Sequence, residues 1–91
     1  MRMADRIAEK LTRALAPVRV QVHDDSARHR GHAGAAAGGE SHFQVEIVSA
    51  QFAGLSRVAR QRLVYGALKD EFAGGVHALE VKTLTPEEDG K

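Results

Sequence analysis

The stretch HFQVEIVS, residues 42–49, alternates apolar and polar side chains along its length. Phe43, Val45 and Ile47 fall on one face, whereas the polar residues between them fall on the other. Successive side chains of a β-strand point to opposite faces of the sheet, so this pattern predicts a strand that is buried on one face only. Such a strand needs neighbouring strands to pair with and a layer of helices to cover its apolar face.

Two other segments have the same period of two and predict the neighbouring strands. VRVQVHDDS, residues 18–26, alternates valine with polar residues and ends in an acidic turn. We expect this first strand to lie antiparallel to residues 42–49. VHALEVKTL, residues 76–84, predicts a third strand with His77 at its beginning.

Two further segments have the period of an α-helix. MADRIAEKLTRALAP, residues 3–17, repeats an apolar residue at every fourth position and ends at Pro17, which cannot continue a helix. From about Arg57 to Phe72 a second apolar stripe predicts another helix, with Ser56 as its N-cap and two glycines soon after it. The expected buried positions of the two helices are Ile7, Leu11, Leu15, Val64, Leu68 and Phe72.

The order helix, strand, strand, helix, strand predicts an α+β fold, a compact three-stranded sheet with helices packed on one face. We expect the 91 residues to form a single domain, 1–91. Residues 26–40 have no periodicity and several glycines, which indicates a long loop. Residues 85–91 are expected to be a polar tail, because Pro86 disfavours continued strand pairing.

The composition restricts the classes of protein that this sequence can encode. Hydrophobic residues make up 43% and charged residues 27%, which is typical of a folded chain. Thirteen Lys and Arg against twelve Asp and Glu leave a net charge of +1, so the molecule as a whole has no field that attracts nucleic acid or membrane. No run of about 18 apolar residues occurs, and we expect a cytoplasmic protein without membrane contact.

The sequence contains no cysteine. It therefore lacks a disulfide framework, a thiolate nucleophile and the means to hold an all-thiolate metal cluster by itself. It also has no serine in a nucleophile elbow and no HExxH zinc helix. We expect a protein that is not an enzyme.

Histidines gather in RHRGHAGAAAGGESHF, residues 28–43. Histidine titrates near neutral pH and is the commonest metal ligand, so the cluster is compatible with a metal site, a proton switch or neither. Strand parity places His42 on the polar face of its strand, where a structural role is the simpler interpretation. His29 and His32 lie on the loop, either as ligands or as solvated residues, and loop ligands alone are poorly preorganised for a metal ion.

Three arginines, Arg57, Arg60 and Arg62, stand in a segment without acidic residues between Gln51 and Leu68. Positive side chains near a helix N-terminus oppose the helix dipole, so helix stability does not explain them. They form a solubilising face, contact carboxylates of a partner, or contact the phosphates of DNA. Against DNA stand the low net charge and an aromatic content of 4%, too small for base-stacking platforms.

Four blocks of the sequence, in this order and at this spacing, resemble the BolA-like protein family. The blocks are DDSARHRGHAG (24–34), GESHFQVEIVS (39–49), FAGLSRVARQRLVYGAL (52–68) and GVHALEVKTLTPEE (75–88). The resemblance spans roughly residues 5–88 and is far more specific than any single motif. It implies the element order αββααβ of a fold resembling the type II KH domain, with an extra helical turn at residues 53–58.

The resemblance also implies partners and a cofactor. BolA-like proteins associate with monothiol glutaredoxins and glutathione, and the pair shares a [2Fe-2S] cluster or makes contact without one; the isolated protein would hold no cofactor. Such pairs act in iron–sulfur trafficking or in iron and stress regulation. Some members are described as transcriptional regulators that act through the helical region, which makes DNA a possible partner.

The family pattern implies cluster ligands on this chain. His77 in GVHAL matches the family's C-terminal histidine ligand, and His29 matches the loop position that carries histidine or cysteine as the second ligand. His32 is an alternative to His29. Two imidazoles on one iron, with thiolates from the glutaredoxin cysteine and glutathione on the other, would raise the reduction potential above that of an all-thiolate cluster.

The sequence departs from the family at the basic helix. The family usually has Arg-His-Arg where this chain has Arg60, Gln61 and Arg62. Glutamine forms hydrogen bonds but does not titrate, so a role that depends on the central histidine does not carry over. The GxxG loop of KH domains is also missing, since FAGLS offers Gly54 alone.

Overall fold

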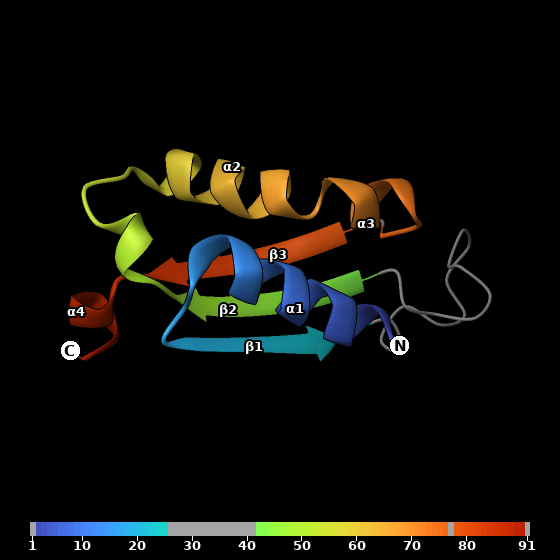
Figure 1. Cartoon of the computed structure of the whole chain (residues 1–91), viewed down its shortest axis with the longest axis horizontal. Coiled ribbons are helices and arrows are strands. Elements are labelled where there is room, and N and C mark those ends of the chain that lie inside the picture. The colour runs from blue at the N-terminus through green and yellow to red at the C-terminus, as the bar shows by residue number, and fades with distance from the viewer. Residues whose placement is uncertain (1, 26–41, 77, 91) are drawn as a thin grey trace.

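Three strands form one sheet in the order β1-β2-β3, and helices cover one of its faces (Figure 1). The structure is a computed structural model that describes residues 2–25, 42–76 and 78–90. Its elements are α1 (Met3–Leu15), β1 (Arg19–Asp24), β2 (His42–Val48), the 3-10 helix η2 (Ala50–Phe52), α2 (Arg57–Ala67), α3 (Lys69–Ala73), β3 (Ala78–Leu84) and α4 (Pro86–Asp89). The predicted α+β class and the three predicted strands are confirmed.

The strands pair in two different ways. β1 lies antiparallel to β2, with Val22 opposite Val45, as predicted. β3 lies parallel to β2, with Val81 opposite Val45. A parallel pair cannot be closed by a tight turn, so the chain between β2 and β3 crosses over the sheet through η2, α2 and α3.

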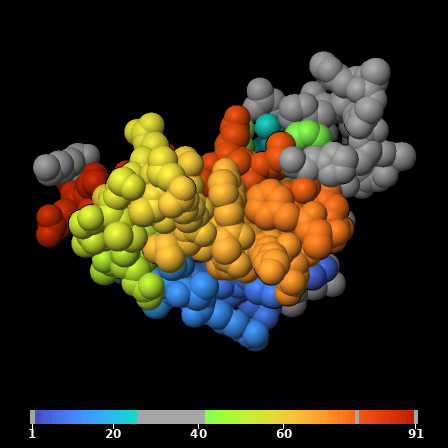
Figure 2. All heavy atoms as spheres, turned by 90° about the horizontal axis from the view of Figure 1, so that it is seen from above, coloured from blue at the N-terminus to red at the C-terminus, as the bar shows by residue number. Residues whose placement is uncertain are grey.

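The core lies between the sheet and the helices. β2 turns its alternate apolar residues toward α1, whose own stripe is fully buried. Figure 2 shows α2 and α3 as one ridge with α1 on one side and β3 on the other. The buried core is Ile7, Leu11, Leu15, Phe43, Val45, Ile47, Phe52, Val64, Leu68 and Val76. The predicted stripe of α1 is confirmed, and Phe72 alone among the predicted helix positions is only partly buried.

The second helix does not run unbroken from Arg57 to Phe72. It ends at Ala67, and α3 begins at Lys69 after Leu68 has left the helical conformation with φ −107° and ψ 18°. The Leu68 amide donates to both Val64 O and Tyr65 O, so the last turn tightens there. This break turns Glu71 toward the core, where a continuous helix would have buried Phe72.

The extra helical turn also lies elsewhere than expected. The structure has it at Ala50–Phe52 instead of residues 53–58. Ser49 caps it by accepting a hydrogen bond from the Gln51 amide at 3.2 Å, and Phe52 fixes it by burying its ring completely. Gly54, at φ +78°, then turns the chain toward α2, a conformation that disfavours any side chain.

The predicted polar tail contains a short helix. Pro86 occupies the first turn of α4, and Thr85 with Glu88 forms a capping box in which each side chain bonds the other residue's amide. Arg60 of α2 pairs with Glu88, Nη1 to Oε1 at 2.7 Å, and Arg19 of β1 pairs with Asp89 at 2.6 Å. Two ion pairs thus tie α4 to the helical layer and to the sheet.

α2 also bonds the backbone of β3. The Tyr65 hydroxyl donates to Leu79 O at 3.4 Å, and Arg60 Nη1 donates to Thr83 O at 3.4 Å. These bonds fasten the crossover helix to the strand it leads into.

Glu71 is a charged residue in the core, and it joins α3 to α1. Its side chain is 1% exposed, and its Oε2 accepts a hydrogen bond from Arg6 Nη2 at 3.1 Å. Lys10 Nζ lies 3.8 Å from the same oxygen. Within the described part of the chain, Glu71 Oε1 has no hydrogen-bond partner. The carboxylate therefore depends on the two cations of α1.

The two members of the Arg6–Glu71 pair should not be equally sensitive to substitution. Arg6 is 46% exposed, so it keeps its hydration when Glu71 is replaced, whereas the buried carboxylate keeps only Lys10 Nζ, at 3.8 Å, when Arg6 is lost. We expect Arg6→Met to lower the free energy of unfolding by about 3 kcal/mol and Glu71→Gln by about 1 kcal/mol, measured by urea denaturation. Arg13→Met is the control, because Arg13 is 76% exposed. Equal costs at Arg6 and Glu71 would contradict a charged Glu71.

The Arg60–Glu88 pair should contribute stability that depends on pH. The guanidinium of Arg60, followed by the Thr85 amide, lowers the pKa of Glu88 from 4.5 to about 2. A lowered pKa stabilises the fold above the unfolded pKa, and that stability disappears as the pH falls toward the folded value.

We therefore expect Glu88→Gln to lower the melting temperature at neutral pH. The difference from wild type should shrink below about pH 4.5 and vanish near pH 2 in thermal unfolding. Glu87→Gln is the matched control, since Glu87 has no ion pair with a described residue. Its small effect on the melting temperature should not disappear between about pH 4.5 and pH 2. A Glu88→Gln difference that is constant from neutral to acidic pH would contradict the ion pair.

Candidate functional site

The histidines predicted as cluster ligands lie outside the described residues. His29 and His32 fall within residues 26–41, and His77 is the residue just before β3. The structure does describe the chain on both sides of these positions, and that part shows where each segment leaves and enters the sheet.

The flanks of both predicted ligand segments meet at one end of the sheet. β1 ends there and β2 begins there, with the Asp25 amide donating to His42 O at 2.8 Å. His42 is in register with Ala78, the first residue of β3. Figure 1 shows this end of the sheet opposite α4. The fold thus brings the chain next to residue 77 beside the chain that flanks residues 26–41.

Two hydrogen bonds define how the chain leaves β1 at this end. Asp25 is 8% exposed, and its Oδ2 accepts from Gln44 Nε2 of β2 at 3.3 Å. The backbone bond from the Asp25 amide to His42 O adds a second connection between the same strands. The last described residue before position 26 is therefore fixed against β2.

The remaining histidines lie on the sheet. His42 is partly exposed at the start of β2, and His23 is exposed near the end of β1. His23 and Gln44 are in register and line a shallow hollow on the sheet face that the helices leave uncovered. Over residues 2–25, 42–76 and 78–90 no group of three or more His, Asp or Glu side chains is placed to hold a metal ion.

The three arginines of the basic helix have different surroundings. Arg57 and Arg62 are exposed, and neither forms an ion pair or side-chain hydrogen bond with a described residue. Arg60 is 13% exposed at its side chain; it donates to Leu55 O and pairs with Glu88. Sequence alone could not separate Arg60 from its neighbours, because Thr83 and Glu88 lie in distant segments.

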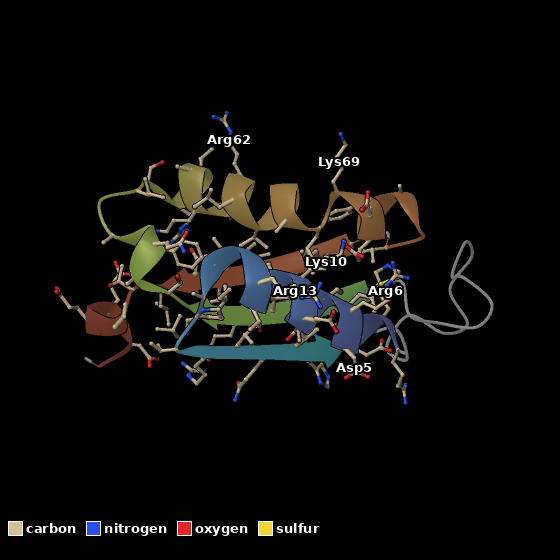
Figure 3. All side chains as sticks on the ribbon, in the orientation of Figure 1. Asp5, Arg6, Lys10, Arg13, Arg62 and Lys69 are labelled. Atoms are coloured by element: carbon tan, nitrogen blue, oxygen red, sulfur yellow. The ribbon has the colours of Figure 1, made fainter. Side chains whose placement is uncertain are left out.

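A further basic residue extends the outer face of α2. Figure 3 shows Lys69 and Arg62 pointing away from the sheet on the same side of the molecule. Lys69 begins α3, seven residues after Arg62, and this spacing of about two helical turns would have indicated that both point to the same side. Gln61, which replaces the family's histidine, is partly buried.

The structure separates the two candidate sites. The chain that flanks the predicted histidine ligands lies at one end of the sheet, while α4 and the start of α2 lie at the other (Figure 1). No helix in the described part of the chain is both long and apolar enough to cross a membrane. The end of the sheet that flanks the predicted histidine ligands and the start of the basic helix are therefore two separate surfaces.

Comparison with known proteins identifies the family. The family model described as BolA-like protein matches residues 11–88. The UV-induced protein uvi31 of Schizosaccharomyces pombe is 49% identical over 88 residues, covering 92% of this chain and 86% of its own. The DNA-binding transcriptional regulator BolA of Escherichia coli is 42% identical over 88 residues, covering 97% of this chain and 80% of its own.

Solved structures have the same fold. The BolA domain of SufE1 from Arabidopsis thaliana superposes with a TM-score of 0.84 at 46% identity, covering 93% of each chain. The resemblance in the four sequence blocks, the sheet topology and these matches agree. The chain belongs to the BolA-like protein family.

Proposed function

We propose that this chain is a non-enzymatic adaptor that binds a monothiol glutaredoxin with its glutathione and co-ligates a [2Fe-2S] cluster. His77 and His29 would hold one iron, with His32 as the alternative to His29. The observation that carries the proposal is the meeting of the flanks of these positions at one end of the sheet. The proposed setting is the cytoplasm, in iron–sulfur trafficking or in iron and stress regulation.

The sheet topology supports a shared site of this kind. Antiparallel β1 and β2 bring both ends of the segment 26–41 to one edge of the sheet, where Asp25 bonds His42. Parallel β3 begins with Ala78 beside His42, at the same end of the sheet. Strand pairing thus holds together the described flanks of segments that lie far apart in sequence, and strand pairing is rigid compared with a loop.

The donor chemistry supports a partner. A chain without cysteine supplies imidazoles only, so the thiolates of the cluster must come from another molecule. A glutaredoxin cysteine and the glutathione thiol have the required chemistry. When bound, the cluster would supply a one-electron redox centre or a transferable iron–sulfur unit.

Replacing His77 should remove this chain's fixed ligand. We expect His77→Ala, reconstituted anaerobically with a monothiol glutaredoxin and glutathione, to lose the absorbance of the histidine-ligated cluster and to weaken the complex in size-exclusion chromatography. His23→Ala is the matched control, because His23 is exposed on the open sheet face. His29→Ala and His32→Ala, measured in parallel, identify the loop ligand. Unchanged absorbance and complex stability in His77→Ala would contradict the ligand assignment.

A second candidate function is DNA binding through the basic helix. It is favoured by the exposure of Arg57 and Arg62, which have no partner in the described part of the chain, and by the name of the E. coli relative. The near-neutral net charge limits it to a local contact. Arg57, Arg60 and Arg62 would contact phosphates and set the position of the helix on the duplex.

The salt dependence of binding tests this second function. Each phosphate contact adds about 0.9 to the slope of log K against log salt. We expect Arg62→Gln to reduce the magnitude of that slope by about 0.9 in fluorescence anisotropy with a labelled DNA duplex. Arg13→Gln makes the same charge change on α1 and should leave the slope unchanged. Equal slopes for wild type and Arg62→Gln would remove Arg62 from the interface.

A further inference from the structure

The guanidinium of Arg60 is held in one orientation by three parts of the chain. Its Nε donates to Leu55 O at 3.0 Å, and its Nη1 donates to Thr83 O at 3.4 Å. Its Cζ lies 6.0 Å from the centre of the Phe52 ring, within the range of a cation–π contact. Because the side chain is only 13% exposed, little rotamer freedom remains to be lost when it binds an anion.

The remaining hydrogen-bond donors of this guanidinium bind a carboxylate. Nη1 lies 2.7 Å from Glu88 Oε1, and Nη2 lies 3.3 Å from Glu88 Oε2. This two-bond arrangement is the one in which arginine binds a carboxylate or a phosphate. Glu88 thus occupies a preformed anion site.

Few contacts hold α4, the segment that carries Glu88, to the rest of the described chain. No residue of the four-residue α4 is buried, and the described side-chain bonds from α4 to the rest of the chain are those of Glu88 and Asp89. Both carboxylates are substantially exposed, 44% and 36%. Exposed ion pairs are worth little and are screened by salt, so another anion can compete for Arg60.

The surroundings of the Arg60–Glu88 pair favour an anion. Arg57, which has no described partner, lines with Arg60 and Glu88 a surface hollow of about 360 Å³. A second hollow of about 470 Å³, next to Gly54, lies on the other side of the same pair. Both adjoin the N-terminal end of the 11-residue α2, where the helix dipole adds positive potential. Glu87 lines the second hollow as well, so the side that favours an anion is the first hollow, beside Arg57.

We infer that Arg60 is a phosphate-binding residue for double-stranded DNA and that α4 is its cover, with Glu88 occupying the site until a DNA phosphate displaces it. The inference rests on the second candidate function and adds to it the control of Arg60 by Glu88. Arg57 and Arg62 make the first contacts, since they are exposed, and Arg60 joins them when Glu88 leaves.

The test compares Glu88→Gln with Glu87→Gln in binding to a labelled DNA duplex. Both variants remove one negative charge from α4, but only the first frees Arg60. Glutamine still satisfies the capping box with Thr85, so α4 keeps its helical turn. We expect Glu88→Gln to bind about two- to fivefold more tightly than wild type at about 50 mM salt, the value of one exposed ion pair. Glu87→Gln removes a charge beside the second hollow but leaves Glu88 on Arg60, so it should gain less.

A second pair of variants shows whether the gain in DNA affinity depends on Arg60. In an Arg60→Gln background, Glu88→Gln should no longer tighten binding, whereas in an Arg62→Gln background the gain should persist. Circular dichroism of each variant verifies that it is folded, because Arg60 also supports Phe52 and β3. The comparison of Glu88→Gln with Glu87→Gln leaves Arg60 intact and does not depend on those backgrounds.

The outcomes separate this inference from the function on which it rests. If wild type binds the duplex and Glu88→Gln binds no better than Glu87→Gln, Glu88 only fastens α4 and the inference is wrong while DNA binding stands. If no variant binds, DNA binding and the inference fail together. A gain that survives Arg60→Gln would also overturn it, because the charge would then act without Arg60.

Discussion

The parallel pairing of β2 with β3 is the constraint on which the rest of the molecule depends. Two strands that point the same way must be joined by a long connection, and η2, α2 and α3 provide it across one face of the sheet. That connection contributes Phe52, Val64 and Leu68 to the buried core, where they pack with residues of the strands. It also fixes which chain segments share an end of the sheet: the flanks of the predicted histidine ligands at one end, and α4 with the start of α2 at the other (Figure 1).

Most of the architecture was predictable because the local periodicity of apolar residues indicates it. Alternation identified the strands, and the fourfold spacing of Ile7, Leu11 and Leu15 identified α1 and its buried face. The errors lie where long-range contacts override the local pattern. The burial of Glu71 depends on Arg6, 65 residues away in sequence, and no periodicity reports such a pair. The helix α4 is a different case, since the capping-box residues Thr85 and Glu88 were visible in the sequence beside Pro86.

The sequence predicted the two candidate sites to different extents. His29, His32 and His77 came from the family resemblance, and the fold brings only the described flanks of their segments to one end of the sheet. The arginines came from charge alone, which treats Arg57, Arg60 and Arg62 as equivalent. Only three-dimensional contacts distinguish the two exposed arginines from Arg60, whose side chain is enclosed by Leu55, Thr83 and Glu88. Charge counting along a helix therefore overestimates the number of cations that are free to meet a partner.

The bonds from Tyr65 and Arg60 to β3 have a consequence for the outer edge of the sheet. Leu84 O accepts from the Ser49 amide, so alternate carbonyls of β3 face β2, and those of Leu79 and Thr83 face the outer edge. An outer edge with open carbonyls is a template on which a strand of another molecule can pair. Because α2 occupies two of these acceptors, a strand of another molecule that pairs with this edge must first displace Tyr65 and Arg60.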